Sequence, residues 1–498
     1  MAEHLISRAE AEVDILACAA YLAEDIKSRE GHAEAMAAII PLYLAKGNVD
    51  LAAELANSVD DPFMRDRLLI LVAQKCADID DDEYALQLAE AVEDFGLQSQ
   101  AREKIALQKA AKGDFQKARE ISDDLDHPDN VYAAIAAKQM ISGDESRADA
   151  TLRDIAFPGA RVSAYLMTAA EKLEEGDESR AVELLEKAVV SAAGSDHDEE
   201  SIRTYCEIAN LFIEAKRNDR AIETFETARN VAEELDNIHR DSFLAAVAVG
   251  FLHAGSVELA DRTLDSITDK TQIATCLLSF ARDSWKREEK DDAFDALGES
   301  YAILKSQHER ETRDTKAKFR LFTSIAAQFA GFEKGERAIE IAQQILDEAE
   351  QVSALSQIAQ IMTLQKHDEL AQQAMRAIPE DAARVFALIN VSDVHQKNGD
   401  PDAAIKTLDE AAVFSETVPQ LVSRSSAYNE IAARLSDLGK TESSNEGLQT
   451  SLATITTIRD ESSRAVALSE FSQVAEKVKF LMNDFAKESL KALVRLTG

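Results

Sequence analysis

Hydrophobic residues recur along the chain in blocks that repeat about every 33 residues. The hexapeptide GDESRA occurs at 143–148 and again at 176–181. The Ala that ends it marks a position, which we call the anchor, that can be followed through twelve units: Ala52, Ala85, Ala118, Ala148, Ala181, Ala221, Ala260, Ala293, Ala338, Ala371, Ala404 and Ser444. Self-similarity at this period is typical of helical repeat arrays.

Within each unit the pattern predicts two amphipathic helices joined by a short turn. Large apolar columns lie thirteen and sixteen residues before the anchor, and a separation of three places both on one helix face. Apolar residues recur four and seven positions after the anchor, as at Leu185 and Ala188. Five residues before the anchor Gly stands in seven units, and Gly is what a helix end uses to turn. The other five units have Asp80, Lys216, Glu288, Glu333 and Lys366 there.

This arrangement resembles the tetratricopeptide repeat (TPR), a helix pair with a bulky, an aliphatic and a small column, a Gly turn and an Ala. The resemblance covers about residues 33 to 460, although the spacing here is 33 residues where the family has 34. Trp never occupies the bulky column. The resemblance implies an all-α fold, a right-handed α-solenoid of about 12–13 antiparallel helix pairs.

The ends of the chain are expected to close this array. We predict an N-terminal capping helix in 1–31, the TPR-like array in 32–462 and a C-terminal capping helix pair in 463–498, because terminal repeats need covered apolar faces. Ala19 lies 33 residues before Ala52. Residues 11–28 are therefore predicted to be the second helix of an incomplete leading unit.

Composition narrows the classes of partner. The chain has 55 Lys and Arg against 92 Asp and Glu, a formal net charge of −37. Nucleic-acid binding needs clustered cations, so this balance argues against it. A protein partner should instead carry basic patches, and its association should weaken with salt.

The same survey bears on the compartment. The first residues carry early acids and no apolar core of signal-peptide length, and no window reaches the about 18 apolar residues of a membrane span. We therefore expect a cytoplasmic protein. Cys18, Cys76, Cys206 and Cys276 lie far apart and are predicted to be reduced, mostly buried thiols.

No motif indicates catalysis, a cofactor or a metal. The tripeptide GKT at 439–441 lacks the Gly that a phosphate loop needs five residues earlier, where Arg434 stands. The acidic run at 78–83 lacks the Gly and the distal Glu of a calcium loop, and 196–200 is a charged insertion. We predict that both are solvated turns and that the chain is not an enzyme.

An Arg recurs twenty residues before the anchor, at the start of the first helix, at Arg65, Arg161, Arg240, Arg384 and Arg424. It can bridge structurally to acids on the preceding helix. Alternatively, the guanidinium groups form a ladder that binds carboxylates of an extended partner. Replacing Arg161 and Arg240 by Ala separates the two hypotheses, because the first predicts a lower melting temperature and the second predicts weaker binding alone.

The resemblance also implies that first helices line a concave groove, with inward positions eighteen, fifteen and eleven before the anchor. These positions are partly polar in several units. Together with the Arg column they make up the predicted partner-binding set: Arg161, Arg203, Asn210, Arg240, Arg320 and Asn429.

The sequence thus predicts a non-catalytic scaffold or adaptor that binds a partner protein or an extended segment on the solenoid surface. Two alternatives stay open. One is a self-associating structural protein that forms a homo-oligomer. The other is a sensor or regulatory component that acts with an effector in trans.

Overall fold

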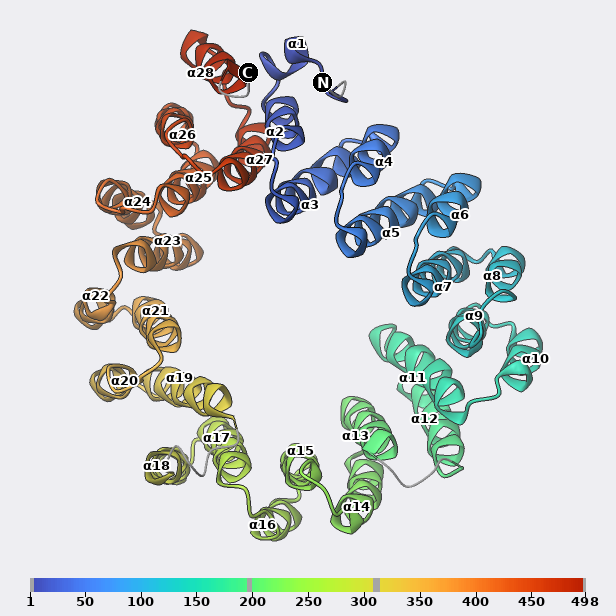
Figure 1. Cartoon of the computed structure of the whole chain (residues 1–498). Coiled ribbons are helices and arrows are strands. Elements are labelled where there is room, and N and C mark those ends of the chain that lie inside the picture. The colour runs from blue at the N-terminus through green and yellow to red at the C-terminus, as the bar shows by residue number, and fades with distance from the viewer. Residues whose placement is uncertain (1–3, 195–198, 308–313, 496–498) are drawn as a thin grey trace. The chain divides into compact units, whose positions relative to one another are not determined.

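The structure, a computed structural model, describes residues 4–194, 199–307 and 314–495 (Figure 1). Every regular element in these ranges is a helix, and consecutive helices pack as pairs. The predicted all-α, TPR-like repeat fold is confirmed.

The twelve predicted units correspond to twelve helix pairs. Their first helices are α3 (Arg29–Ala45), α5 (Pro62–Asp78), α7 (Phe95–Lys112), α9 (Asp129–Ile141), α11 (Pro158–Glu174), α13 (Glu199–Glu214), α15 (Arg240–His253), α17 (Lys270–Lys286), α19 (Thr315–Gly331), α21 (Glu348–Leu364), α23 (Asp381–Lys397) and α25 (Leu421–Asp437). Their second helices are α4 (Val49–Asn57), α6 (Asp82–Glu90), α8 (Phe115–Ser122), α10 (Glu145–Asp154), α12 (Glu178–Ala192), α14 (Asn218–Glu234), α16 (Val257–Asp265), α18 (Lys290–Ser306), α20 (Gly335–Ala342), α22 (Asp368–Ala377), α24 (Pro401–Ser415) and α26 (Thr441–Ile455). The remaining helices are α1 (Arg8–Ala11), α2 (Ile15–Glu24), α27 (Glu461–Val478) and α28 (Asp484–Arg495).

The helices form two compact units. One consists of Met1–Ala101 together with Gln351–Gly498, and the other is Arg102–Glu350. The division falls within α7 and α21.

The anchors are buried in every unit. All twelve are at most 3% exposed. The apolar column thirteen residues earlier is buried in every unit except one, where Phe280 is half-buried. At the one anchor that is not Ala, the hydroxyl of Ser444 donates a hydrogen bond to the carbonyl oxygen of Ala432 at 2.7 Å. A small side chain is therefore kept at each of these sites because a larger one would separate the helices.

The turn between the two helices has the left-handed backbone in all twelve units. The seven Gly residues have φ of 74–85°, and the five other residues at this position have φ of 58–65°. A non-Gly residue in this region costs about 1–2 kcal/mol through contact of its Cβ with the backbone. Packing of the helix pair outweighs that cost at Asp80, Lys216, Glu288, Glu333 and Lys366.

The two ends of the chain together make a further helix pair. Helix α27 has the features of a first helix: Arg464 donates to the carbonyl oxygen of Ile458 at 3.2 Å, Phe471 is fully buried, and Lys479 at its end has φ of 57°. It packs on α2, whose Ala19 is fully buried, and on α3 (Figure 1).

This pairing of the ends differs from the predicted closing pair within 463–498. Helix α28 packs on α26 and α2. The predicted second helix at 11–28 is thus completed by α27, which supplies the missing first helix of its unit. Helix α2 thus packs on a helix that lies more than 400 residues away in sequence. The neighbouring α3 also contacts α27, through a hydrogen bond from Ser462 Oγ to Glu34 Oε2 at 2.7 Å.

All four cysteines are free, as predicted: Cys18, Cys76 and Cys276 are buried and Cys206 is half-buried. Burial raises the pKa of Cys276 to about 12. Within the described ranges, no helix has the length and apolar character that crossing a bilayer requires.

The left-handed turns predict which Gly substitutions stabilise the chain. Replacing Glu288, Glu333 and Lys366 together by Gly should raise the urea midpoint, because removing the Cβ strain adds about 1 kcal/mol per site to the free energy of unfolding. Gly176→Ala should lower the midpoint, since Gly176 has φ of 82°. Gly298→Ala is the matched control: Gly298 is inside α18 with open space around it, so Ala should stabilise by about 0.5–1 kcal/mol. Equal effects of the two Ala substitutions would contradict this account.

The joined ends predict a long-range effect of a substitution in α3. A Cβ on Gly31 would lie 2.8 Å from Ser28 Oγ and 3.2 Å from Ser462 Cβ. Gly31→Val should therefore loosen α27 by about 1–3 kcal/mol, seen as faster amide hydrogen exchange in 461–478. Gly47→Ala, which strains the α3–α4 turn without meeting another atom, should leave exchange in α27 unchanged. Unchanged hydrogen exchange in α27 of both variants would argue against the packing of α27 on α3.

Candidate functional site

The Arg column twenty residues before the anchor serves the loops between units. Arg384 Nη2 donates to the carbonyl oxygen of Ile378 at 2.7 Å, and Arg424 Nε donates to that of Val418 at 2.8 Å. Arg161 Nη2 lies 3.5 Å from the carbonyl oxygen of Ala156. Each guanidinium thus bonds the loop five or six residues before it, a structural role that differs in detail from the predicted bridge to acids.

The other two members of the column contact a buried carboxylate. Arg65 Nη2 lies 3.6 Å from Asp66 and 2.8 Å from Glu93, and Arg240 Nη1 lies 2.8 Å from Asp241. Asp241 Oδ2 accepts hydrogen bonds from the amides of Thr268 and Asp269 at 2.8 and 2.7 Å. Burial alone would raise the pKa of Asp241, but these bonds and Arg240 lower it.

This carboxylate belongs to a second column that the sequence analysis missed. Asp66, Asp129 and Asp241 all stand nineteen residues before an anchor. Asp66 Oδ2 accepts from the amides of Glu93 and Asp94, and the two oxygens of Asp129 accept from those of Ala156 and Phe157. The recurrence of Asp at one register was the signal that could have identified these loop clamps.

The other predicted partner-binding residues are divided by burial. Arg203, Asn210 and Arg320 are exposed, and Arg203 also lies over the ring of Phe243 at 5.3 Å. Asn429 is 3% exposed, and its Oδ1 accepts from Ser451 Oγ at 2.7 Å. The prediction that Asn429 faces a partner is therefore wrong, because its amide belongs to the packing between α25 and α26.

The cause is the angular position of the column. Residues eighteen, fourteen and eleven before the anchor fall within about 60° around the helix, and the residue fifteen before it lies at the edge toward a neighbouring helix. Ala245, Thr323 and Asn429 at that edge are buried, whereas no residue fourteen before an anchor is buried. The exposed face of the first helices thus passes through the fourteenth position, as at Met167 and Glu207.

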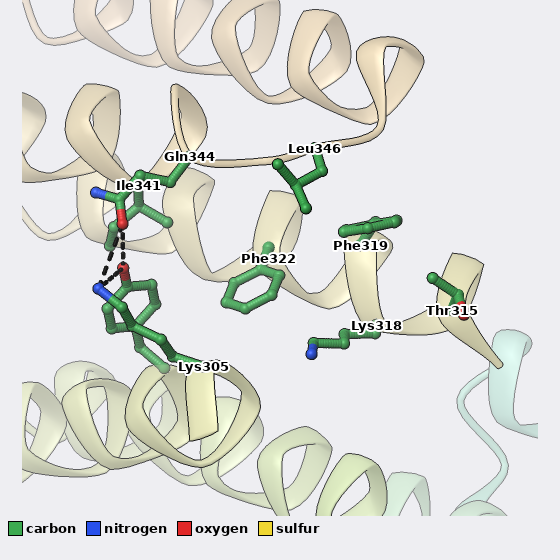
Figure 2. A pocket seen from close by; sticks show the side chains of 9 residues that line it. Lys305, Thr315, Lys318, Phe319, Phe322, Ile341, Gln344 and Leu346 are labelled. Atoms are coloured by element: carbon green, nitrogen blue, oxygen red, sulfur yellow. Dashed lines mark hydrogen bonds between the residues drawn. The ribbon is translucent and has the colours of Figure 1, made fainter. Parts of the chain in front are cut away.

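An apolar pocket lies at the surface between α18, α19 and the segment that begins with α20 (Figure 2). We call it the α18–α20 pocket. It lies in the longest unit, where 45 residues separate Ala293 from Ala338 and α18 has 17 residues against 9 in α16. The volume is about 210 Å³, and the lining residues are Tyr301, Lys305, Thr315, Lys318, Phe319, Phe322, Ile341, Gln344 and Leu346.

The walls of this pocket are held in place by aromatic and polar contacts. The rings of Tyr301 and Phe322 meet edge to face with centroids 5.8 Å apart. Tyr301 donates its hydroxyl to Gln344 Oε1 at 3.1 Å, and Lys305 Nζ lies 3.4 Å from both oxygens (Figure 2). Tyr301 is 8% exposed, whereas Leu346 at the rim is 79% exposed. A rigid floor and an open apolar rim are features of a site that receives a side chain.

A larger hollow of about 390 Å³, lined by Arg240, Asp241, Thr268 and Asp269 among others, is polar. Its Asp241 oxygens already accept the loop amides described above, so this hollow is accounted for by the clamp. The described part of the chain has no cluster of three or more His, Cys, Asp or Glu that could hold a metal ion. Asp81, within the acidic run 78–83, caps α6 by accepting from the amide of Tyr84. Asp196–Asp198, in the other acidic segment, lie outside the described residues.

Comparisons with known proteins assign no function to the chain. No protein-family model and no curated protein matches the chain. Similar solved structures include Ton1535 from Thermococcus onnurineus NA1, with 16% identity over 71% of this chain and 97% of that one, at a TM-score of 0.26. The Cut9–Hcn1 hetero-tetramer of the APC/C has 12% identity over 88% and 95%, at 0.22. A circular tandem repeat protein with a novel repeat topology has 16% identity over 94% and 92%, at 0.15.

The Arg column predicts a loss of stability on truncation. Arg384→Ala and Arg424→Ala should each lower the urea midpoint, because a loop carbonyl loses a charged donor and the free energy of unfolding falls by about 1–3 kcal/mol. Far-UV circular dichroism during unfolding measures this. Arg203→Ala, at an exposed side chain, should stay within about 0.5 kcal/mol of the parent. Unchanged stability of the Arg384→Ala and Arg424→Ala variants would contradict the structural role of the Arg column and favour the hypothesis that it binds carboxylates of a partner.

Proposed function

We propose that the chain is a non-catalytic scaffold that binds a partner protein, with the α18–α20 pocket as one anchoring site. The observation that carries the proposal is the pocket itself, in which Phe319 and Phe322 are half-buried and Leu346 is exposed beside a rigid floor. A few apolar anchors in well-packed pockets supply most of the free energy of protein association.

The pocket is smaller than the about 300–1,000 Å³ of most small-molecule sites. One bulky side chain suits it better than a whole metabolite or cofactor. This supports a protein partner over a substrate, and thus the non-catalytic function.

The rest of the surface supports a broad interface around such an anchor. The exposed first-helix face includes the predicted residues Arg203, Asn210 and Arg320. With a net charge of −37, that face is expected to favour basic patches on the partner.

Self-association is the second candidate, because large apolar side chains are exposed at other places. Phe95 is 85% exposed, Val190 76% and Leu481 70%. Isolated exposed apolar residues are common on monomers, so this observation weighs less than the pocket.

Site-specific photo-crosslinking in the native cells tests the proposal. A benzophenone amino acid in place of Leu346 should crosslink a distinct partner protein, since Leu346 forms the pocket rim. The same amino acid at Val190, which is equally exposed but distant from α18–α20 in sequence, is the control and should capture much less of that protein. A product of two 54.6 kDa chains would favour self-association, and no product at position 346 would overturn the assignment of the pocket.

A further inference from the structure

The α18–α20 pocket contains a buried ammonium group without a carboxylate. Lys318 is 9% exposed, and its Nζ donates to the carbonyl oxygen of Gln307 at 2.6 Å. In the described part of the chain, Lys318 forms no ion pair. An ammonium has three N–H donors, and one neutral acceptor leaves two of them available. Burial of a cation under these conditions is costly unless an anion joins it.

A second ammonium lines the same pocket. The partners of Lys305 Nζ are the hydroxyl of Tyr301 and the Oε1 of Gln344, both neutral. The carboxylate of Glu340, on α20, is bound to Arg337 at 2.8 Å. The pocket thus combines an apolar floor with two cations that have only neutral partners among the residues described.

The local sequence is basic within an acidic chain. Helix α19 carries Lys316, Lys318 and Arg320 and no Asp or Glu. The described residues 301–307 and 314–320 have four Lys or Arg against one Asp, a formal excess of three positive charges where the whole chain has −37. The pocket therefore favours a ligand charge opposite to the one that the whole chain favours.

Resting on the proposed function, we infer that the α18–α20 pocket binds a segment of the partner protein that presents one aromatic or large aliphatic side chain beside a carboxylate. The apolar side chain packs between Phe319, Phe322 and Leu346. The carboxylate accepts hydrogen bonds from Lys318 and Lys305, which completes the donor set of the buried ammonium. A partner with basic patches elsewhere can carry such a segment, so the pocket sets the register of the partner on the array.

Fluorescence anisotropy of labelled peptides against the full chain tests this inference. One short peptide has a central Phe flanked by Asp and Glu, a second has the same Phe flanked by Lys and Arg, and a third keeps the acids but replaces Phe by Ala. The acidic Phe peptide should bind the most tightly, and its Ala counterpart should lose about tenfold or more. Tighter binding of the basic Phe peptide would overturn the inference.

Variants of the chain identify the groups responsible. Lys318→Met should weaken the acidic Phe peptide by about tenfold or more, because a desolvated charge pair is lost. Lys305→Met, at an exposed side chain, should weaken it by about two- to fivefold. Lys286→Met, at an exposed Lys on α17 outside the pocket, is the control and should have no effect. Thermal melting checks that the Lys318→Met variant folds. If it does not fold, the Lys305→Met variant, changed at an exposed side chain, tests the inference instead.

The outcomes separate this inference from the proposed function. If none of the peptides binds while the probe at Leu346 crosslinks a partner protein, the inference of an acidic segment is wrong and the proposed scaffold function is supported. If the peptides fail and the crosslink is absent, both are wrong. Binding of the acidic peptide that Lys318→Met leaves unchanged would overturn the role of the buried ammonium. If light scattering shows a dimer that the acidic Phe peptide dissociates, the occupant is a second copy, and the separate partner is overturned.

Discussion

The close approach of two helices at a buried small side chain is the contact on which the whole repeat array depends. Every anchor from Ala52 to Ser444 is buried, and the apolar column thirteen residues earlier packs into the same core. A larger residue at the anchor would overpack this contact, at a cost of about 1–3 kcal/mol in strained side chains and shifted backbone. The conformation of the turn before the anchor is determined by this helix packing. The turn keeps the left-handed backbone even where Glu288 or Lys366 replaces Gly.

The same contact explains how the ends of the chain join. Helix α2 carries an anchor residue, Ala19, but no first helix precedes it among the described residues. Helix α27 carries the features of a first helix and packs on α2. Each of the two would otherwise present an apolar face to water, so their packing covers both faces together. Helix α27 also packs on α3, where Gly31 lies close to Ser462 and Glu34 accepts a hydrogen bond from the Ser462 hydroxyl.

The repeat columns could be predicted from the sequence because each records a contact within one unit. Twelve recurrences average out the degeneracy of any single unit, so the anchors, the apolar columns and the turns were all identified. Contacts that occur once have no such support. The pairing of α2 with α27 joins residues more than 400 positions apart, and the α18–α20 pocket forms in a single unit, the one with the widest anchor spacing. The sequence analysis placed Asn429 on the exposed face of its helix, but it is buried. Adjacent positions of a helix point in different directions, and the residue types in one column do not show which of these directions faces solvent.

The pairing of α2 with α27 also affects when α2 can reach its native environment. During synthesis α2 leaves the ribosome more than 430 residues before α27 does. At about 5–20 residues per second, roughly 20–90 s pass before the two can meet. In that interval the face of α2 that packs on α27 lacks the surface that finally covers it. Helix α2 therefore reaches its native environment well after it is made, and this apolar face stays accessible to chaperones until then.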